Sequence, residues 1–421
     1  MSLTRPITRS LTRAITRALT APGAGGGANN EATIVILLGQ SLNVPRGSTL
    51  LAAPWPEAQM LEAGGAASSA FTFWATNPLH CTNWTDVASS VSYTEGAAQG
   101  VGAGILNTLK DGPRPTAYSM SVAIGARPLT ILEQGAPRAQ LAASIYRLCD
   151  IARADGYTPK VVFYSAHGET DAFDGTTEAN YYSRGKEYYQ MAQMYAAMAM
   201  EDPSYVAPVY LTYPAQQSTT LANLGENDRN IKEAIRRIAQ DLDGGVDMGS
   251  IYQWPIESDR VHPEENAYIF RGERLGRILA GNPEPAPYIT GVTLSGATFV
   301  ATFSEPVVRD ASLGVGSALN AANALDGFEW LDNGAFIQIT GLVYSGATVT
   351  GTLASTPSGS LAQQQLRIAC QYTGSSLAVW PANDAGSYVR ADTAGWESPY
   401  DPTYTNYRWA IPQRITEVEA A

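Results

Sequence analysis

Residues 33–41 read TIVILLGQS, a β-branched apolar run that stops abruptly at Gly39, Gln40 and Ser41. A short continuous apolar run bounded by a turn residue is typical of a strand buried on both faces. In open α/β sheets the ligand crevice lies beyond the carboxyl ends of the strands, and a glycine lets the chain turn sharply there. The stretch therefore predicts a serine nucleophile at the tip of a buried strand. Such turns are also common in ordinary loops, so the prediction needs support from elsewhere in the chain.

A base for this serine has few candidates, because the chain has three histidines, His80, His167 and His262. A serine hydroxyl is a poor nucleophile until a neighbouring base takes its proton. His262 stands three residues after Asp259, a spacing that lets the carboxylate orient the imidazole and stabilise its charged form. The same aspartate precedes the helix-like stretch 264–279, so a helix cap is the simpler alternative, and both roles can hold together.

Four short blocks follow one another in the order typical of SGNH hydrolases. They are GQS at 39–41, AIG at 123–125, HGETDA at 167–172 and DRVHP at 259–263. The set resembles the sialate O-acetylesterase and carbohydrate acetylesterase branch of that superfamily, which reads Gly-Gln-Ser, a glycine block, Gln-Gly-Glu-Ser-Asp-Ala and Asp-x-x-His. The resemblance covers about residues 32–282. It implies an SGNH-type parallel sheet flanked by helices, and an esterase that removes acetyl groups from sugars without a cofactor.

Carried over residue by residue, the resemblance assigns Ser41 as the nucleophile, His262 as the general base and then acid, and Asp259 as its orienting carboxylate. It also implies an oxyanion hole formed by the backbone N–H groups of Ser41 and Gly125 and by the side chain of His167. The chain departs from the family at this last position, where glutamine or asparagine is usual. A neutral imidazole can donate through one N–H, so the departure implies a slower enzyme, not an inactive one.

Four neighbouring residues are assigned supporting or substrate-binding roles: Gln40, Gly168, Glu169 and Asp171. The two carboxylates are suited to orient His167 or to bind sugar hydroxyls. Carboxylates in a Gly-Glu-Thr-Asp turn also commonly cap the segment that follows, and the sequence leaves both interpretations open.

Composition limits the class of protein. The chain has 421 residues, 45% of them hydrophobic, with 39 glycines and 25 prolines, which fits a loop-rich globular protein of two or three domains. A net charge of −12 argues against a nucleic-acid-binding body. No apolar run approaches the roughly 18 residues of a membrane span, and the N-terminus lacks a secretory apolar core. Cys81, Cys149 and Cys370 are scattered, which suits a reducing compartment and predicts neither a disulfide framework nor a metal site.

The body of the chain divides into a mixed part and a strand-rich part. Residues 31–282 predict an α/β domain with a parallel sheet, with a lid insertion near 45–115. Residues 283–287 form a stiff linker, and residues 288–421 alternate with a period of two, which predicts an antiparallel β-sandwich accessory domain. The predicted strands of the α/β domain are 34–38, 119–124, 161–165 and 209–213, and its predicted helices are 138–153, 178–200, 230–242 and 264–279.

The N-terminus repeats a four-residue unit, Leu or Ile followed by Thr and Arg, from Leu3 to Thr20, and a glycine-rich linker completes residues 1–30. One such helix cannot bury its slanting apolar stripe alone, so it should order only against a partner or copies of itself. The repeat resembles the attachment segments of bacteriophage tail-fibre and spike proteins. This resemblance implies that residues 1–20 join phage structural proteins in the virion. Because fibres and spikes are often trimers, a homotrimer is one expectation.

Three hypotheses follow. The leading one is a serine esterase that removes O-acetyl groups from a cell-surface polysaccharide or sialic-acid-like sugar, carried by a phage fibre or spike and made in the host cytoplasm. The second is a carbohydrate-binding receptor protein with the same fold and weak catalysis. The third is a free cellular acetylesterase, cytoplasmic or organellar, whose acid-free, arginine-rich leader is a targeting segment.

Overall fold

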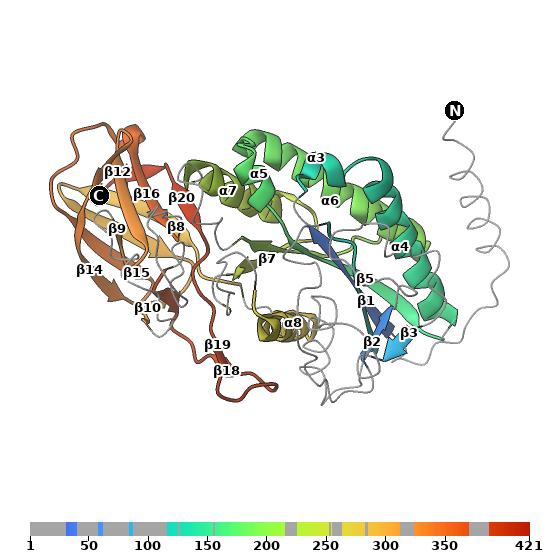
Figure 1. Ribbon diagram of the computed structural model, residues 1–421. Coiled ribbons are helices and arrows are strands. Elements are labelled where there is room, and N and C mark those ends of the chain that lie inside the picture. Colours follow the sequence, from blue (N-terminus) through green and yellow to red (C-terminus); the bar gives the residue numbers. More distant parts are fainter. Residues whose placement is uncertain are drawn as a thin grey trace.

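The protein consists of an α/β part and a β part that lie side by side in a computed structural model of the chain (Figure 1). The structure describes residues 31–39, 58–61, 84–86, 116–124, 127–154, 156–214, 225–251, 254, 263–282, 285–311, 324–369 and 387–421, with only the backbone at 58–61, 84–86, 116–119, 225, 226, 228, 265 and 324.

A seven-stranded sheet in the order β3-β2-β4-β1-β5-β6-β7 forms the centre of the α/β part. Neighbouring strands pair in parallel, except β2 and β3, which are antiparallel. The strands β4, β1, β5 and β6 correspond to the parallel strands that the alternating sequence pattern predicts, and β2 and β7 extend the parallel sheet. The strands are β1 (Glu31–Gly39), β2 (Ala58–Leu61), β3 (Trp84–Asp86), β4 (Thr116–Ser121), β5 (Thr158–Ala166), β6 (Val209–Tyr213) and β7 (Gly245–Ser250).

The apolar run of residues 33–38 lies in β1, which is placed between β4 and β5 and is buried on both faces. Ile34 and Ile36 pack into the cluster that contains α4, α6 and α7, while Val35 and Leu37 pack into the cluster that contains α8. All four side chains are 0% exposed. Burial of one such side chain contributes about 1.5–3 kcal/mol to folding, so the run stabilises both layers of the α/β part.

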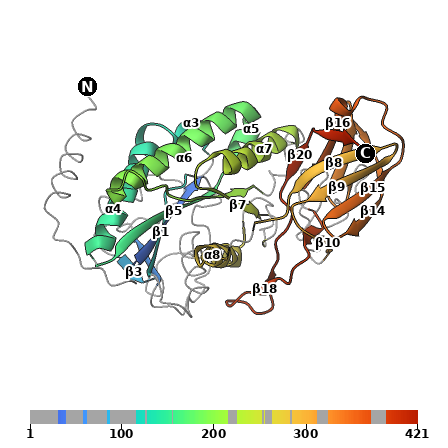
Figure 2. The same cartoon turned by 180° about the vertical axis from the view of Figure 1, so that it is seen from behind.

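Helices cover the two faces of the sheet unequally. The helices α3 to α7 lie on one face and α8 on the other (Figures 1 and 2). Among the helices described, none is both long and apolar enough to cross a bilayer. The helices are α3 (Leu129–Leu132), α4 (Gly135–Ala154), α5 (Glu169–Phe173), α6 (Glu178–Met200), α7 (Gly225–Asp241) and α8 (Glu265–Leu279).

The structure corrects the predicted strands in three places. β4 spans Thr116–Ser121 and not 119–124. Its pairing with β1 runs from Thr116 opposite Ala32 to Ser121 opposite Leu37. β7 was not predicted, because its sequence GVDMGS contains two glycines and an aspartate. β2 and β3 fall within the range predicted as a lid and instead extend the sheet. The rest of that range lies outside the described residues.

The β part is built from two five-stranded sheets. One has the order β14-β15-β9-β8-β21, and the other has the order β11-β12-β16-β20 with β13 on β12. All pairs are antiparallel except β21 with β8. The strands are β8 (Ile289–Ser295), β9 (Thr298–Phe303), β11 (Ala324–Leu325), β12 (Phe328–Asp332), β13 (Ala335–Ile337), β14 (Ile339–Ser345), β15 (Thr348–Leu353), β16 (Gln364–Ile368), β20 (Gln413–Ile415) and β21 (Val418–Ala420).

Aromatic side chains join the two sheets of the β part. The rings of Phe299 and Trp330 are stacked with centroids 5.1 Å apart, and Phe303 meets Phe328 edge-on at 6.4 Å. Because β9 and β12 belong to different sheets, these contacts form a sandwich core. Two strand pairs and a short 3₁₀ turn complete this part: β10 (Val307–Arg309) with β17 (Val389–Ala391), β18 (Trp396–Glu397) with β19 (Thr405–Asn406), and Leu361–Gln363.

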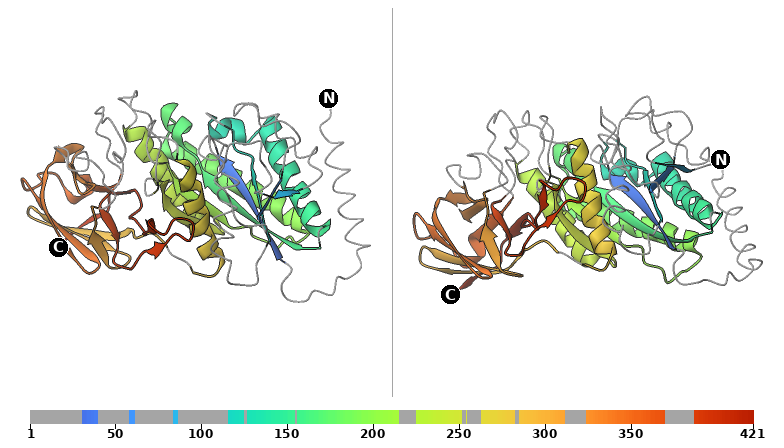
Figure 3. Two further views of the ribbon diagram at one scale, coloured as in Figure 1. Left: turned by 60° about the horizontal axis from the view of Figure 1, so that its bottom comes forward. Right: turned by 90° about the horizontal axis from the view of Figure 1, so that it is seen from below.

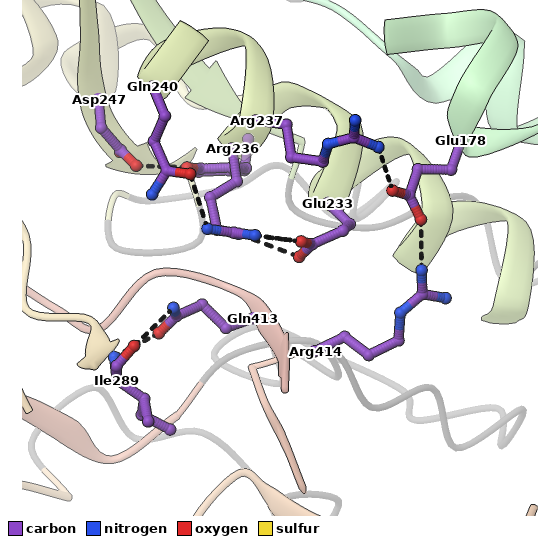
Figure 4. A network of polar contacts seen from close by, with 10 residues as sticks. Glu178, Glu233, Arg236, Arg237, Gln240, Asp247, Ile289, Gln413 and Arg414 are labelled. Carbon is purple, nitrogen blue, oxygen red and sulfur yellow. Dashed lines mark hydrogen bonds and ion pairs between the residues drawn. The ribbon is translucent and has the colours of Figure 1, made fainter. Parts of the chain in front are cut away.

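Ion pairs connect the β part to the helices of the α/β part. Glu178, the first residue of α6, accepts a hydrogen bond from Arg237 of α7 at 2.9 Å and another from Arg414 of β20 (Figure 4). Arg414 also donates to Asn230 of α7 at 3.0 Å. One arginine of the β part is therefore fixed to two helices of the neighbouring part.

We expect Gly39→Ala to lower the free energy of unfolding by at least about 3 kcal/mol, because a Cβ there meets backbone atoms at a φ that disfavours side chains. Gly346→Ala is the matched control. Gly346 also has a positive φ, of 56°, but no atom within 4 Å of an added Cβ, so its substitution should cost about 1 kcal/mol. Urea unfolding of both variants measures the difference, and equal losses would contradict the packing argument.

Candidate functional site

The candidate site lies where the order of the parallel strands reverses. Across the sheet the six parallel strands, from β2 to β7, run second, third, first, fourth, fifth and sixth in sequence order. In such sheets ligands bind outside the carboxyl ends of the strands at the reversal. The reversal lies between β1 and β5, whose last residues, Gly39 and Ala166, are paired partners.

Gly39 is required at the end of β1 for steric reasons. Its φ is 118°, and an added Cβ would lie 2.2 Å from the carbonyl oxygen of Ala166. Only glycine combines this backbone conformation with this close approach. The residue stands two positions before Ser41, so the turn that the sequence predicts begins here.

The segment after β4 contacts the end of β1 on the side opposite to β5. The backbone N–H of Val122 donates to the carbonyl of Leu37 at 3.0 Å, and the N–H of Ile124 donates to the carbonyl of Gly39 at 3.0 Å. Ile124 precedes Gly125, the predicted second oxyanion donor. The first and second sequence blocks are therefore hydrogen bonded to each other.

His167 follows β5 directly, and only 2% of the residue is exposed. Its Nδ1 lies 2.9 Å from the hydroxyl of Tyr181, and its Nε2 lies 3.0 Å from the carbonyl oxygen of Arg127. A carbonyl can only accept, so Nε2 carries the proton and donates to Arg127. Nδ1 then accepts a hydrogen bond from the Tyr181 hydroxyl. The two contacts together fix the tautomer and the orientation of the ring.

The protonation of this pair follows from its burial. Burial lowers the pKa of His167, although the Asp171 carboxylate, 3.7 Å from Nε2, and the Arg127 carbonyl oppose that change. Burial also raises the pKa of Tyr181 well above its ordinary value. Near neutral pH the ring is therefore uncharged and the hydroxyl keeps its proton, as the hydrogen-bond directions require.

The single N–H of the neutral His167 ring is thus engaged within the protein. An oxyanion donor must point to the substrate oxygen, whereas this N–H points to Arg127. The oxyanion role of His167 stays a prediction, and it requires a rearrangement that breaks the bond to Arg127. In the described structure, the hydrogen bond from His167 to the Arg127 carbonyl connects the third block to the chain two residues beyond Gly125.

Asp171 makes a second connection of the same kind. Its Oδ2 accepts a hydrogen bond from the backbone N–H of Leu129 at 3.1 Å, and its Oδ1 accepts one from the Thr176 hydroxyl at 3.2 Å. Leu129 begins α3, which has no capping side chain of its own at Pro128. The carboxylate therefore caps a helix 42 positions away in the sequence, and does so beside the His167 ring.

Gly168 and Glu169 complete the described part of the third block. Gly168 has a φ of 137°, and an added Cβ would lie 2.5 Å from Cγ2 of Ile231 in α7. Glu169 begins α5 and is 4% exposed, unlike an ordinary solvated helix-terminal carboxylate. Their supporting or substrate-binding roles stay predictions.

Five assigned residues lie outside the described part of the chain: Gln40, Ser41, Gly125, Asp259 and His262. Their catalytic, oxyanion and supporting roles stay predictions.

The topology still limits where the fourth block connects. β7 ends at Ser250, and α8 begins at Glu265, three residues after His262. Because β7 is parallel to β6, β5 and β1, the chain leaves β7 at the same edge of the sheet as Gly39.

Sequence reasoning missed Tyr181, the partner of His167 Nδ1. Tyr181 lies in α6, 14 residues after the histidine, and no motif joins the two positions. One signal was present, because α6 places several tyrosines on the side that faces the core, including Tyr188 and Tyr189. Buried tyrosine hydroxyls need polar partners, and a buried histidine is one.

The described residues offer little support for a metal site or for a cysteine nucleophile. No three His, Cys, Asp or Glu side chains among them group as metal ligands. Cys149 is a free, buried cysteine, and burial raises the pKa of its thiol to about 12. Such a thiol is a poor nucleophile at neutral pH.

Comparisons with known proteins find solved structures of low similarity only. No family model and no curated protein matches the chain. Among solved structures, a protein from Arabidopsis thaliana aligns with a TM-score of 0.41 and 17% identity over 60% of this chain and 100% of that chain. NanS aligns with a TM-score of 0.40 and 12% identity over 61% of this chain and 98% of that chain. Scores of this size define no family.

The buried neutral histidine predicts a specific pH dependence. The folded pKa of His167 lies below the unfolded value of about 6.5, so the unfolded chain takes up a proton first as the pH falls. Its contribution to stability should be complete above about pH 6.5 and should be lost as the pH falls toward the folded pKa, by up to about 1.4 kcal/mol per pH unit.

Urea unfolding of the wild type and of His167→Gln across this range measures the effect. Other groups titrate in both proteins, so the difference between the two isolates the histidine. The wild type should lose more stability than the variant as the pH falls. Parallel pH profiles would contradict the assignment of a buried neutral ring.

Proposed function

We propose that this chain is an SGNH-type serine esterase that removes O-acetyl groups from a carbohydrate. Ser41 is the nucleophile, His262 the general base and acid, and Asp259 the carboxylate that orients His262. The backbone N–H groups of Ser41 and Gly125 stabilise the oxyanion. The substrate class, an acetylated surface polysaccharide or sialic-acid-like sugar, follows from the acetylesterase-like order of the four blocks.

One observation carries the proposal. Gly39, two residues before Ser41, is bonded on one side to Ile124, next to Gly125, and is paired on the other side with Ala166, next to the third block. An esterase of this kind needs its nucleophile and oxyanion donors within a few ångströms of each other. Three blocks that are far apart in the sequence meet at the switch point of the sheet, where such a site belongs.

The first half of the proposed reaction transfers the acetyl group to the protein. His262 takes the proton of Ser41 as the hydroxyl oxygen attacks the acetyl carbonyl carbon. The carbonyl oxygen becomes negative in the tetrahedral intermediate and is stabilised by the two backbone N–H groups. The bond to the sugar oxygen then breaks, and that oxygen receives the proton from His262. The sugar leaves with a free hydroxyl, and Ser41 carries an acetyl ester.

The second half returns the protein to its starting state. A water molecule attacks the acetyl carbonyl while His262 takes its proton. The bond to Ser41 breaks, and the serine oxygen recovers that proton. The products of the whole reaction are acetate and the deacetylated sugar.

A second function, carbohydrate binding with little turnover, is favoured by one observation. The His167 N–H is engaged by Arg127 and leaves only two predicted donors for the oxyanion. Loss of one donor typically lowers the rate about 10²- to 10³-fold. Sugar binding without acetate release from the wild-type protein would support this second function.

We expect Ser41→Ala to lower kcat/KM for an activated acetyl ester by at least about 10³-fold, because the acetyl-enzyme can no longer form. Colorimetric hydrolysis of the ester, together with acetate release from O-acetylated polysaccharides, measures the change. Ser345→Ala is a matched control, because Ser345 is an exposed turn serine of the β part. It should retain wild-type activity. Equal hydrolysis by the wild type and Ser41→Ala would overturn the proposed esterase.

We also propose that residues 1–20 attach the protein to a phage fibre or spike, so that binding and deacetylation occur at the host envelope. Support comes from the Leu/Ile-Thr-Arg repeat and the glycine-rich stretch that follows it. The repeat lies outside the described residues, and the expected homotrimer stays a prediction.

Deletion of residues 1–20 should abolish incorporation into particles and leave ester hydrolysis unchanged. Immunodetection of the protein in purified particles, with the full-length chain as control, measures incorporation. Particles that still carry the truncated chain would contradict attachment through the repeat. Cleavage of the leader in the mature protein would instead support the targeting alternative.

A further inference from the structure

A short arm of the β part extends along α8. The arm comprises residues 396–406 and contains the strand pair β18–β19. It leaves the sandwich and lies beside the helix in every view (Figures 1, 2 and 3). Because α8 belongs to the α/β part and begins three residues after His262, the arm brings the two parts into contact near the fourth sequence block.

The arm contacts the C-terminal half of α8 through charged groups. The guanidinium of Arg277 lies 4.9 Å from the centre of the Trp396 ring. Oε1 of Glu273 accepts a hydrogen bond from the Ser398 hydroxyl at 3.0 Å and another from the backbone N–H of Tyr400 at 3.1 Å. Glu273 is 0% exposed, so water cannot replace these donors without opening the interface.

The arm contacts the N-terminal half of α8 through aromatic packing. The rings of Phe270 and Tyr404 are stacked with centroids 3.9 Å apart and an interplanar angle of 9°. The next contact is on the segment that precedes the helix, where Nε1 of Trp254 donates to Oδ1 of Asn406 at 3.4 Å. The arm thus follows the helix from its C-terminal half to the chain before its first turn.

These contacts fall on one face of α8. Phe270, Glu273 and Arg277 are spaced by three and four residues, which places them in one row on a helix. Arg271 lies on a different face and donates through Nε to the hydroxyl of Tyr164 in β5 at 2.7 Å. The helix is therefore held between the central sheet and the arm.

We infer that the arm is a positioning element for the histidine of the proposed esterase. Asp259 and His262 lie in sequence between Trp254 and the start of α8, and the arm contacts the chain on both sides of that stretch. The β part then holds Trp254, five residues before Asp259, and Phe270, eight residues after His262, and thereby positions the general base. The inference rests on the proposed function for the role of His262, and it makes Tyr404, Ser398 and Asn406 positioning residues.

The test removes the aromatic contact and keeps an apolar side chain at the position. Tyr404→Leu removes the stack on Phe270, whereas Tyr404→Phe keeps it and should restore activity. Tyr344→Leu is the matched control, because Tyr344 is a tyrosine of the same β part whose hydroxyl donates to Asp326, away from α8. A purely structural role predicts that Tyr404→Leu and Tyr344→Leu lose stability but keep the turnover number.

Positioning predicts a different kinetic result. For Tyr404→Leu, kcat for the activated acetyl ester should fall by about 10- to 100-fold while KM changes by less than about twofold, because misplacement of a base lowers the rate of chemistry. Tyr404→Phe and Tyr344→Leu should keep kcat within about twofold of the wild type. Wild-type kcat in folded Tyr404→Leu would overturn the inference. If that variant does not fold, Ser398→Ala and Asn406→Ala are measured against the same criterion.

Hydrogen exchange separates this inference from the proposed function. Backbone amides of residues 265–279 should exchange faster in Tyr404→Leu than in Tyr344→Leu, whether or not the protein hydrolyses esters. Unchanged exchange would overturn the claim that the arm holds the helix. Absence of Ser41-dependent hydrolysis in the wild type would overturn the proposed function and, with it, the catalytic consequence. Intact hydrolysis with unchanged kcat in Tyr404→Leu would overturn the inference alone.

Discussion

The close approach of Gly39 to the carbonyl of Ala166 is the constraint on which the carboxyl edge of the sheet depends. β1 and β5 stay paired over nine consecutive residues up to that contact, and a Cβ at position 39 would separate them at its end. The carbonyl of the same glycine accepts the N–H of Ile124. One peptide therefore sets the spacing of three chain segments, and each continues into a sequence block assigned to the site.

The parts of the fold that the sequence predicted are those with a local signal. β6 matches its predicted range, and α6 begins and ends as expected, because continuous apolar runs and helical periodicity are properties of neighbouring residues. β7 carries Asp247 between Val246 and Met248, and its strand conformation depends on pairing with β6. The contact between His167 and Tyr181 could not be predicted either, because a contact between different elements leaves no pattern in the sequence.

The polar contacts around His167 use the full hydrogen-bonding capacity of its side chain. An amide side chain has two N–H donors and one acceptor, whereas a neutral imidazole has one donor and one acceptor. Tyr181 and Arg127 use both functions of the ring. An amide bonded to the same carbonyl would keep one N–H for a substrate oxygen. His167 therefore connects the second and third blocks but has no spare donor.

The β part is not a tethered module, because it shares a hydrophobic core with the α/β part. The cluster that contains Leu37 and Tyr268 continues into Phe299 and Trp330 of the sandwich. A sandwich with a separate core could move on its linker without disturbing the sheet. Here any such movement would expose apolar surface on both sides and break the bonds of Arg414 to α6 and α7. The two parts are therefore held together by shared apolar packing as well as by polar contacts.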